Sequence, residues 1–231
     1  MKSPEEFAQL PVVARAVTDF HDVCLQLATW PAQPVAFAEA DVWHWVATNH
    51  RNNCLLWDQE DLARRTRASD ADITANKRAI DGYNQARNDA TERVDEFLLI
   101  SLGLVDPVTA GTDQPVARVS SGARLNSETA GSMMDRMSIM SLKIRAMRTQ
   151  TLRADVDDAH RSASKLKLDR LNEQRDDLGR CLNELLDDSR AGQAYFKVYR
   201  QFKMYNDPRF NPVLVAEVLA AKAAQARSAQ Q

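Results

Sequence analysis

The sequence predicts an all-α protein, a bundle of long antiparallel helices with one long irregular loop. The chain of 231 residues contains only 7 Gly and 8 Pro, which is about half the usual share of these residues and leaves few tight turns for a β-sandwich or barrel. Apolar residues also recur at intervals of three and four through most of the chain, and no segment shows the apolar–polar alternation of a strand.

The charge balance and the cysteines limit the classes of partner. With 30 Lys plus Arg and 32 Asp plus Glu, the net charge is −2, which excludes attraction of the whole surface to nucleic acid or to an anionic membrane. Cys24, Cys54 and Cys181 are widely spaced and form no C-x-x-C pair, so neither a disulfide framework nor a zinc knuckle is indicated. The N-terminus lacks the apolar run of a signal peptide, and no stretch is long enough for a membrane span. We therefore expect a cytoplasmic protein with no nucleic-acid partner, and its oligomeric state stays open.

The first half of the chain predicts three helices. The first covers about residues 4–30, with Pro11 as a kink or a break. The second covers about residues 37–65. The third starts after a cap at Ser69 and ends near Leu102, which makes it roughly 45–50 Å long.

The second half begins with turn formers and then returns to helical periodicity. Residues 106–131 contain most of the turn formers, and they predict a long irregular loop. A fourth helix carries a methionine-rich stripe, and a fifth carries a leucine stripe: Met133, Met137, Met140, Ile144 and Met147, then Leu166, Leu171, Leu178, Leu182 and Leu185. A short helix over Tyr195–Met204 and an Ala-rich helix over 213–224 follow, with a frayed tail at 225–231. All of these elements are expected in one domain, residues 1–231.

Polar residues lie on a helix face of the second segment that a bundle would bury. Val46, His50, Asn53, Trp57 and Glu60 are spaced 4, 3, 4 and 3. Burying the three polar side chains without partners would cost about 1–3 kcal/mol each. Neighbouring helices, water or a ligand must therefore satisfy them.

The third helix offers candidate partners for those groups. Arg87 interrupts its apolar stripe, and a continuous polar line runs beside that stripe through Lys77, Asp81, Asn84, Asn88, Glu92 and Asp95. Two interpretations stay open. The line is either a solvated face with ion pairs at i,i+4 or one wall of a cleft that presents donors and carboxylates.

The predicted start of the fourth helix suits an anion. The first turn of a helix exposes backbone N–H groups, and Ser132, Asp135, Arg136 and Lys143 follow in this region. Free donors together with Arg136 and Lys143 would hold a phosphate or a carboxylate. The alternative is that Ser132 only caps the helix and that Arg136 pairs with the third helix.

Four ordered blocks resemble one family, the bacterial domain-of-unknown-function family 4254. They run from His50 to Arg64, from Lys77 through Arg78 and Asp81 to Asp95, from Gly131 to Lys143, and from Tyr199 to Pro208. The resemblance covers about residues 50–212. It implies a helical protein whose relatives are encoded near genes of sugar transfer and lipopolysaccharide synthesis, and it implies no established chemistry.

The hypothesis that we favour is a protein that binds an anionic sugar-type ligand, such as a phosphorylated sugar or a nucleotide sugar, without a cofactor. The resemblance adds a role as an accessory to envelope polysaccharide or lipopolysaccharide assembly. The residues expected to bind the ligand come from three helices: His50, Asn53, Trp57, Lys77, Arg78, Asp81, Asn84, Arg87, Asn88, Ser132, Asp135, Arg136 and Lys143.

Two alternatives belong to other classes. The first is a magnesium-dependent hydrolase of nucleotides or sugar diphosphates, in which Mg²⁺ is held by Glu60, Asp61, Glu92 and Asp95. The second is a helical scaffold for a glycosyltransferase partner, in which the polar stripes only fix the pairing of helices. The sequence does not decide whether the protein is an enzyme.

Overall fold

The computed structural model describes residues 3–200 and 209–228. The sequence predicts one domain, whereas the chain divides into two compact units with their boundary between Val198 and Tyr199. The second unit contains one helix, α6, over Pro212–Ser228. None of the described helices combines the length and the hydrophobicity that crossing a bilayer requires.

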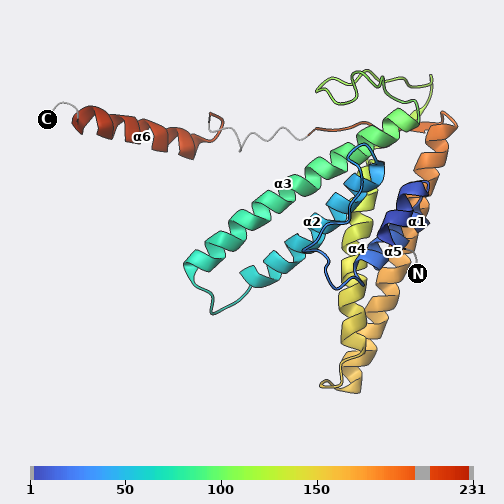
Figure 1. The fold of residues 1–231 in the computed structure, drawn as a ribbon, viewed down its shortest axis with the longest axis horizontal. Helices are drawn as coiled ribbons and strands as arrows, with labels where there is room; N and C mark the ends of the chain where they lie inside the picture. The colour runs from blue at the N-terminus through green and yellow to red at the C-terminus, as the bar shows by residue number, and fades with distance from the viewer. Residues whose placement is uncertain (1–2, 201–208, 229–231) are drawn as a thin grey trace. The chain divides into compact units, whose positions relative to one another are not determined.

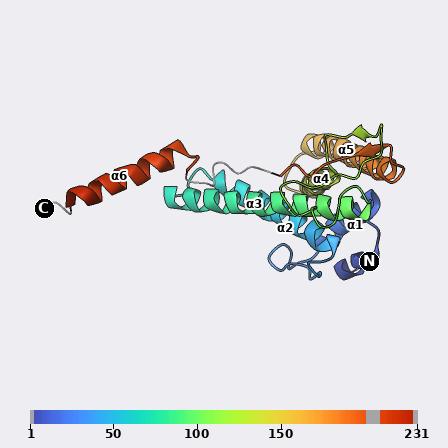
Figure 2. The ribbon, with the colours of Figure 1, turned by 90° about the horizontal axis from the view of Figure 1, so that it is seen from above.

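Two helical hairpins make up most of the first unit (Figures 1 and 2). Helices α2 and α3 pair along their length, as do α4 and α5, and contacts between α2, α3 and α4 join the two hairpins. The bounds are Val42–Ala63 for α2, Asp70–Ser101 for α3, Ala130–Thr151 for α4 and Asp158–Arg190 for α5. The predicted all-α class is confirmed.

The N-terminal segment covers one end of the bundle with aromatic side chains. It forms a 3₁₀ helix over Pro4–Gln9 and α1 over Ala14–Cys24, with the predicted proline break between them. The Phe7 and Phe20 rings pack edge to face at 5.4 Å, and each lies 5.5 Å from the Trp43 ring. Because all three side chains are almost fully buried, this cluster fixes α1 against α2.

Capping side chains determine where the two longest helices begin. The Ser69 side chain accepts from the backbone N–H of Asp72, and the Asp72 side chain accepts from Ser69 in return, as the sequence predicts for the start of α3. The Asp157 carboxylate accepts from the backbone N–H of His160 at the start of α5. These bonds satisfy N–H groups that have no partner within the helix.

The segment between α3 and α4 is irregular, as predicted, and it is largely exposed but anchored at a few points. Several of its apolar side chains are buried: Leu104, Val105 and Ala110. Strand β1 (Arg124–Leu125) pairs in parallel with β2 (Ala194–Tyr195), which follows α5. Helix α4 already begins at Ala130, one residue earlier than the predicted loop ends.

The predicted helix over Tyr195–Met204 is wrong for residues 195–200, and 201–208 lie outside the described residues. Gly192 ends α5 with φ of 70°, a conformation that glycine adopts without strain. The chain then pairs with β1 as an extended strand and buries Phe196. Pairing with a distant segment therefore overrides the local helical pattern. Helix α6 continues to Ser228, beyond the predicted range of 213–224.

The leucine stripe of α5 is buried only in its second half. Leu178, Leu182 and Leu185 belong to the core, whereas the Leu166 side chain is 73% exposed. Helix α1 covers α5 near Arg175 and Asn183, which bond to Asp22 and to the N–H of Ala14. The turn end of the α4–α5 hairpin extends beyond α1 (Figure 1), which explains why Leu166 departs from the predicted core stripe.

Helices α3 and α4 approach most closely at Gly131. A Cβ atom built on Gly131 would lie 2.6 Å from the carbonyl oxygen of Thr91 and 3.0 Å from the Asp95 carboxylate. The buried Asp95 carboxylate accepts from the backbone N–H of Gly131 at 2.7 Å. Burial raises the pKa of Asp95 to about 7. The contact between α3 and α4 therefore depends on Gly131, which has no side chain, and on the Asp95 carboxyl group, whose raised pKa keeps it protonated to a higher pH.

Replacing Gly131 by Ala should destabilise the fold by about 1–3 kcal/mol, because the new methyl group overlaps the backbone of α3. The matched control is Gly82→Ala within α3, where a Cβ atom has no neighbour within 4 Å. This control should stabilise the fold by about 0.5–1 kcal/mol. Urea denaturation monitored by circular dichroism measures both changes, and equal stabilities of the two variants would contradict the close approach.

Asp95→Asn should change how stability depends on pH. In the wild type the unfolded Asp95 loses its proton near pH 3.8 and the folded one only near pH 7, so its contribution to stability decreases as pH rises between these values. The stability of Asp95→Asn relative to wild type should therefore increase by up to about 1.4 kcal/mol per pH unit and level off above pH 7. Urea denaturation at pH 5, 6, 7 and 8 tests this. Asp81→Asn, on the exposed part of α3, controls for the loss of one charge, and an equal slope in both variants would contradict the prediction.

Candidate functional site

A buried polar cluster joins α2 to α4. The Oδ1 atom of Asp135 accepts from the side-chain amides of Asn49 at 2.8 Å and Asn53 at 2.9 Å. The Asn53 amide also lies 3.1 Å from the Ser138 hydroxyl oxygen, which is 2.8 Å from Nδ1 of His50. Helix α4 thus satisfies His50 and Asn53 of the predicted polar stripe, whereas Glu60 of that stripe pairs with Arg64 at i,i+4.

Arg87 adds a charge from α3 to this cluster. Its Nε atom lies 3.8 Å from Oδ1 of Asp135, and one terminal nitrogen donates to Asn88 at 3.2 Å. The Nε group itself is buried and makes no hydrogen bond within the described residues. Arg87 interrupts the apolar stripe of α3 because its partner lies on α4.

A cleft of about 450 Å³ opens beside this cluster, between α2, α3 and α4. Asn53 and Arg87 reach it from the buried side. The complete lining consists of Asn53, Leu56, Trp57, Glu60, Asp61, Arg64, Asn84, Arg87, Ile139 and Leu142. Because two carboxylates face two guanidinium groups, the formal charge of the wall is balanced. Planar polar side chains thus surround one aromatic ring and a few aliphatic groups.

The cleft gathers part of the residue set that the sequence predicts. Asn53, Trp57, Asn84 and Arg87 line it. Asp135 lies behind it as the partner of Asn53 and Arg87. Predicted residues from three helices therefore meet in one place.

His50 is buried behind this cleft rather than within its lining. Its ring lies 4.4 Å from that of His21 and stacks on Trp30 at 5.5 Å. Burial lowers the pKa of His50 to about 3 and that of His21 well below its usual value. Both rings are therefore neutral near pH 7. In this state His50 supports the position of Ser138 and adds no charge to the site.

Three predicted ligand-binding residues lie on the exposed face of α3, outside the cleft lining. Lys77 forms an ion pair with Asp81 at i,i+4, and Arg78 is exposed. Asn88 accepts from Arg87 next to the cleft. The polar line of α3 is thus a solvated face at its start and a cleft wall at its centre, so each of the two interpretations describes one part of it.

At the start of α4, oxygen atoms of the protein accept from the backbone N–H groups of Gly131, Ser132 and Met133. The cap is Thr129 rather than Ser132, since the Thr129 hydroxyl accepts from the backbone N–H of Ser132 at 3.1 Å. Asp95 accepts from the N–H of Gly131, and Arg136 pairs with Glu128 at 2.5 Å. These contacts favour the alternative in which a side chain only caps this helix start, and the anion site there stays a prediction.

The four carboxylates of the magnesium hypothesis lie in two separate places. Glu60 and Asp61 line the cleft and pair with Arg64. Glu92 and Asp95 lie further along the hairpin. Hydrogen bonds from Asn76 to Gln59 and from Asn49 to Thr91 fix how α3 lies along α2. Gln59 and Asn49 are about 15 Å apart along α2 at 1.5 Å per residue, so the first carboxylate pair lies near one of these bonds and the second pair near the other. Within the described residues, no group of three or more acidic, His or Cys side chains is placed to hold a metal ion.

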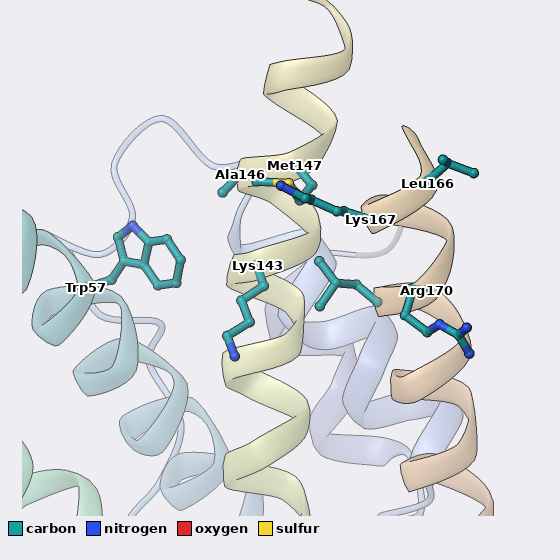
Figure 3. A pocket seen from close by; sticks show the side chains of 8 residues that line it. Trp57, Lys143, Ala146, Met147, Leu166, Lys167 and Arg170 are labelled. Carbon is teal, nitrogen blue, oxygen red and sulfur yellow. The ribbon is translucent and has the colours of Figure 1, made fainter. Parts of the chain in front are cut away.

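Lys143 lines a second depression, a groove between α4 and α5 that also touches Trp57 (Figure 3). The sequence places Lys143 together with Arg136, but the two side chains have different surroundings. Arg136 faces Glu128, whereas Lys143 lies on the side of α4 that faces Trp57.

Sequence reasoning misses several residues of the site, and three of them had a visible signal. Asn49 lies one turn before Asn53, and Ser138 lies three residues after Asp135, so each shares a helix face with a residue that was identified. Arg64 had the same signal, since it lies one turn after Glu60, whereas His21 had none. The place of His21 depends on how α1 packs.

Comparison with known proteins identifies a family but no activity or ligand. Residues 43–198 match the family described as "Protein of unknown function (DUF4254)". The search of curated proteins and the search of solved structures each found no match. The family match includes the whole cleft lining and covers more than half of the chain. The chain therefore belongs to the DUF4254 family.

Proposed function

We propose that the cleft between α2, α3 and α4 binds an anionic sugar-type ligand, a phosphorylated sugar or a nucleotide sugar. The observation that carries this proposal is the lining itself, in which amides, carboxylates and guanidinium groups surround the ring of Trp57. A volume of about 450 Å³ falls within the usual range for small-molecule sites, about 300–1,000 Å³.

The amides and carboxylates of the lining suit the sugar part of such a ligand. A sugar presents hydroxyl groups that both donate and accept hydrogen bonds, together with an apolar C–H face. The Asn84 amide supplies both a donor and an acceptor, and the Asn53 carbonyl oxygen and the carboxylates of Glu60 and Asp61 supply acceptors. The Trp57 ring, which is partly exposed, supplies an apolar surface for the C–H face.

The two guanidinium groups suit the phosphate. Arg87 is held from behind by Asp135, so its position is fixed before a ligand arrives. Arg64 pairs with Glu60 and Asp61 at the exposed rim, where an ion pair contributes little and a phosphate can replace it. Charge-assisted bonds from arginine to phosphate are among the stronger hydrogen bonds in proteins.

The wider setting of the proposal rests on the family resemblance alone. It is an accessory role in envelope polysaccharide or lipopolysaccharide assembly. The cleft supports binding in this setting. The separation of the two carboxylate pairs favours binding over the magnesium-dependent hydrolase.

Arg87→Gln should weaken binding of a hexose 1-phosphate or a nucleoside diphosphate hexose by about 10- to 100-fold, because one charge-assisted hydrogen bond contributes about 1.5–3 kcal/mol. Titration calorimetry measures the affinities, with the free hexose and inorganic phosphate as partial ligands that should bind more weakly. The matched control is Arg136→Gln, which removes an exposed arginine outside the cleft and should leave the affinity unchanged. Asn84→Ala is a second cleft variant that keeps the Arg87–Asp135 pair, so a folding defect is distinguished from a binding defect.

Three outcomes would contradict this proposal. The first is the absence of binding by every probe. The second is an equal loss of affinity in Arg87→Gln and Arg136→Gln. The third is steady phosphate release with Mg²⁺ that Glu60→Gln abolishes, which would establish the hydrolase instead. Co-purification of a glycosyltransferase by a protein that binds none of the probes would support the scaffold.

A further inference from the structure

The groove between α4 and α5 is lined by apolar groups near the turn end of the hairpin. Its volume is about 660 Å³, and Figure 3 shows its walls on α4 and α5 with Trp57 of α2 at one side. The lining consists of Trp57, Lys143, Ala146, Met147, Leu166, Lys167, Arg170 and Leu171. Leu166 is 73% exposed, which is unusual for a leucine on a helix with a buried stripe and leaves apolar surface uncovered.

The charged residues of this groove are all cations. Lys143, Lys167 and Arg170 line it, and no acidic side chain does. Two cations of α5 are paired, since Arg170 within the groove contacts Glu173 at 3.0 Å and Lys165 outside it contacts Asp169. By contrast, neither Lys143 nor Lys167 has a hydrogen-bond or ion-pair partner in the part of the chain that the structure describes.

The size of the groove favours one small amphiphilic molecule over a partner helix. The lining residues of α4 are confined to 143–147 and those of α5 to 166–171, so each wall is little more than one turn long. A docked helix needs anchors over two or more turns, about 10 Å. A volume of about 660 Å³ is that of a single ligand.

We propose that this groove binds an anionic amphiphile, a molecule with one alkyl chain and a phosphate head. The chain lies against Met147, Leu166 and Leu171, and the phosphate pairs with the ammonium group of Lys143 or with that of Lys167, which point to different parts of the groove (Figure 3). Burying the chain supplies affinity through the hydrophobic effect, about 0.8 kcal/mol per buried CH₂ group. The two unpaired lysines favour a head group with a negative charge. This site stands independently of sugar binding in the cleft.

Titration calorimetry with dodecyl phosphate below its micellar concentration tests the proposal. Dodecyl phosphate should bind at least tenfold more tightly than butyl phosphate, which lacks the long chain, and than a neutral dodecyl polyethylene glycol ether. The double variant Lys143→Gln/Lys167→Gln should lose about tenfold or more in affinity for dodecyl phosphate and keep its affinity for the neutral ether. Leu166→Gln should weaken both dodecyl ligands, and because this side chain is exposed the fold should not change.

The matched control is Lys165→Gln, which removes a cation of the same helix that pairs with Asp169 outside the groove. It should bind dodecyl phosphate as the wild type does, and Arg87→Gln, altered in the cleft, should do the same. Equal affinities of the wild type for dodecyl phosphate and the neutral ether would overturn the proposal, as would an equal loss in the Lys165→Gln control. Binding to vesicles that contain phosphatidylglycerol but not to monomeric dodecyl phosphate would show a membrane-surface contact in place of a single-molecule site.

Discussion

One carboxylate oxygen, Oδ1 of Asp135, holds the three central helices in register. It accepts from two asparagine amides of α2 and lies 3.8 Å from the guanidinium group of Arg87 on α3. Leaving any one of these buried groups unpaired costs about 1–3 kcal/mol, and more for a charge. A shift of α4 by one residue would break all three interactions at once. Polar groups thus specify which faces of the helices meet. Apolar packing specifies this less strictly, because apolar side chains can repack in several arrangements.

The same constraint shapes the cleft. Because Asp135 fixes Arg87 and Asn53 from behind, both side chains border the cleft in defined positions. The neutral His21–His50 pair fills the space on the far side of Ser138 without adding charge. A ligand would therefore meet a site whose polar groups are already ordered, which lowers the entropic cost of binding.

Local sequence predicts the helices well and their contacts only in part. The start of α3 follows from Ser69 and Asp72, since a capping box needs only neighbouring residues. The polar stripe through His50 and Asn53 also predicts that partners exist, but their identity depends on how α4 crosses α2. The cap of α4 illustrates the limit, because Thr129 and Ser132 both fit a cap locally and the close approach of Asp95 to Gly131 determines the geometry. Likewise, the exposure of Leu166 and the strand at Tyr195 follow from distant packing, which no local pattern contains.

The two depressions that share Trp57 differ in how their charges are balanced, and this difference indicates different ligands. In the cleft each carboxylate faces a guanidinium group, so a ligand must exchange existing ion pairs for its own and gains mainly from the geometry of its hydrogen bonds. In the groove two lysines lack such partners within the described chain, so an anion gains their attraction without displacing a carboxylate from either of them. If both proposals hold, discrimination between polar ligands of similar size belongs to the cleft, whereas the groove selects only the sign of the charge and the presence of an apolar chain. In that case residues of α2 and α3 would recognise the sugar-type ligand, and the turn end of the α4–α5 hairpin would hold the amphiphile.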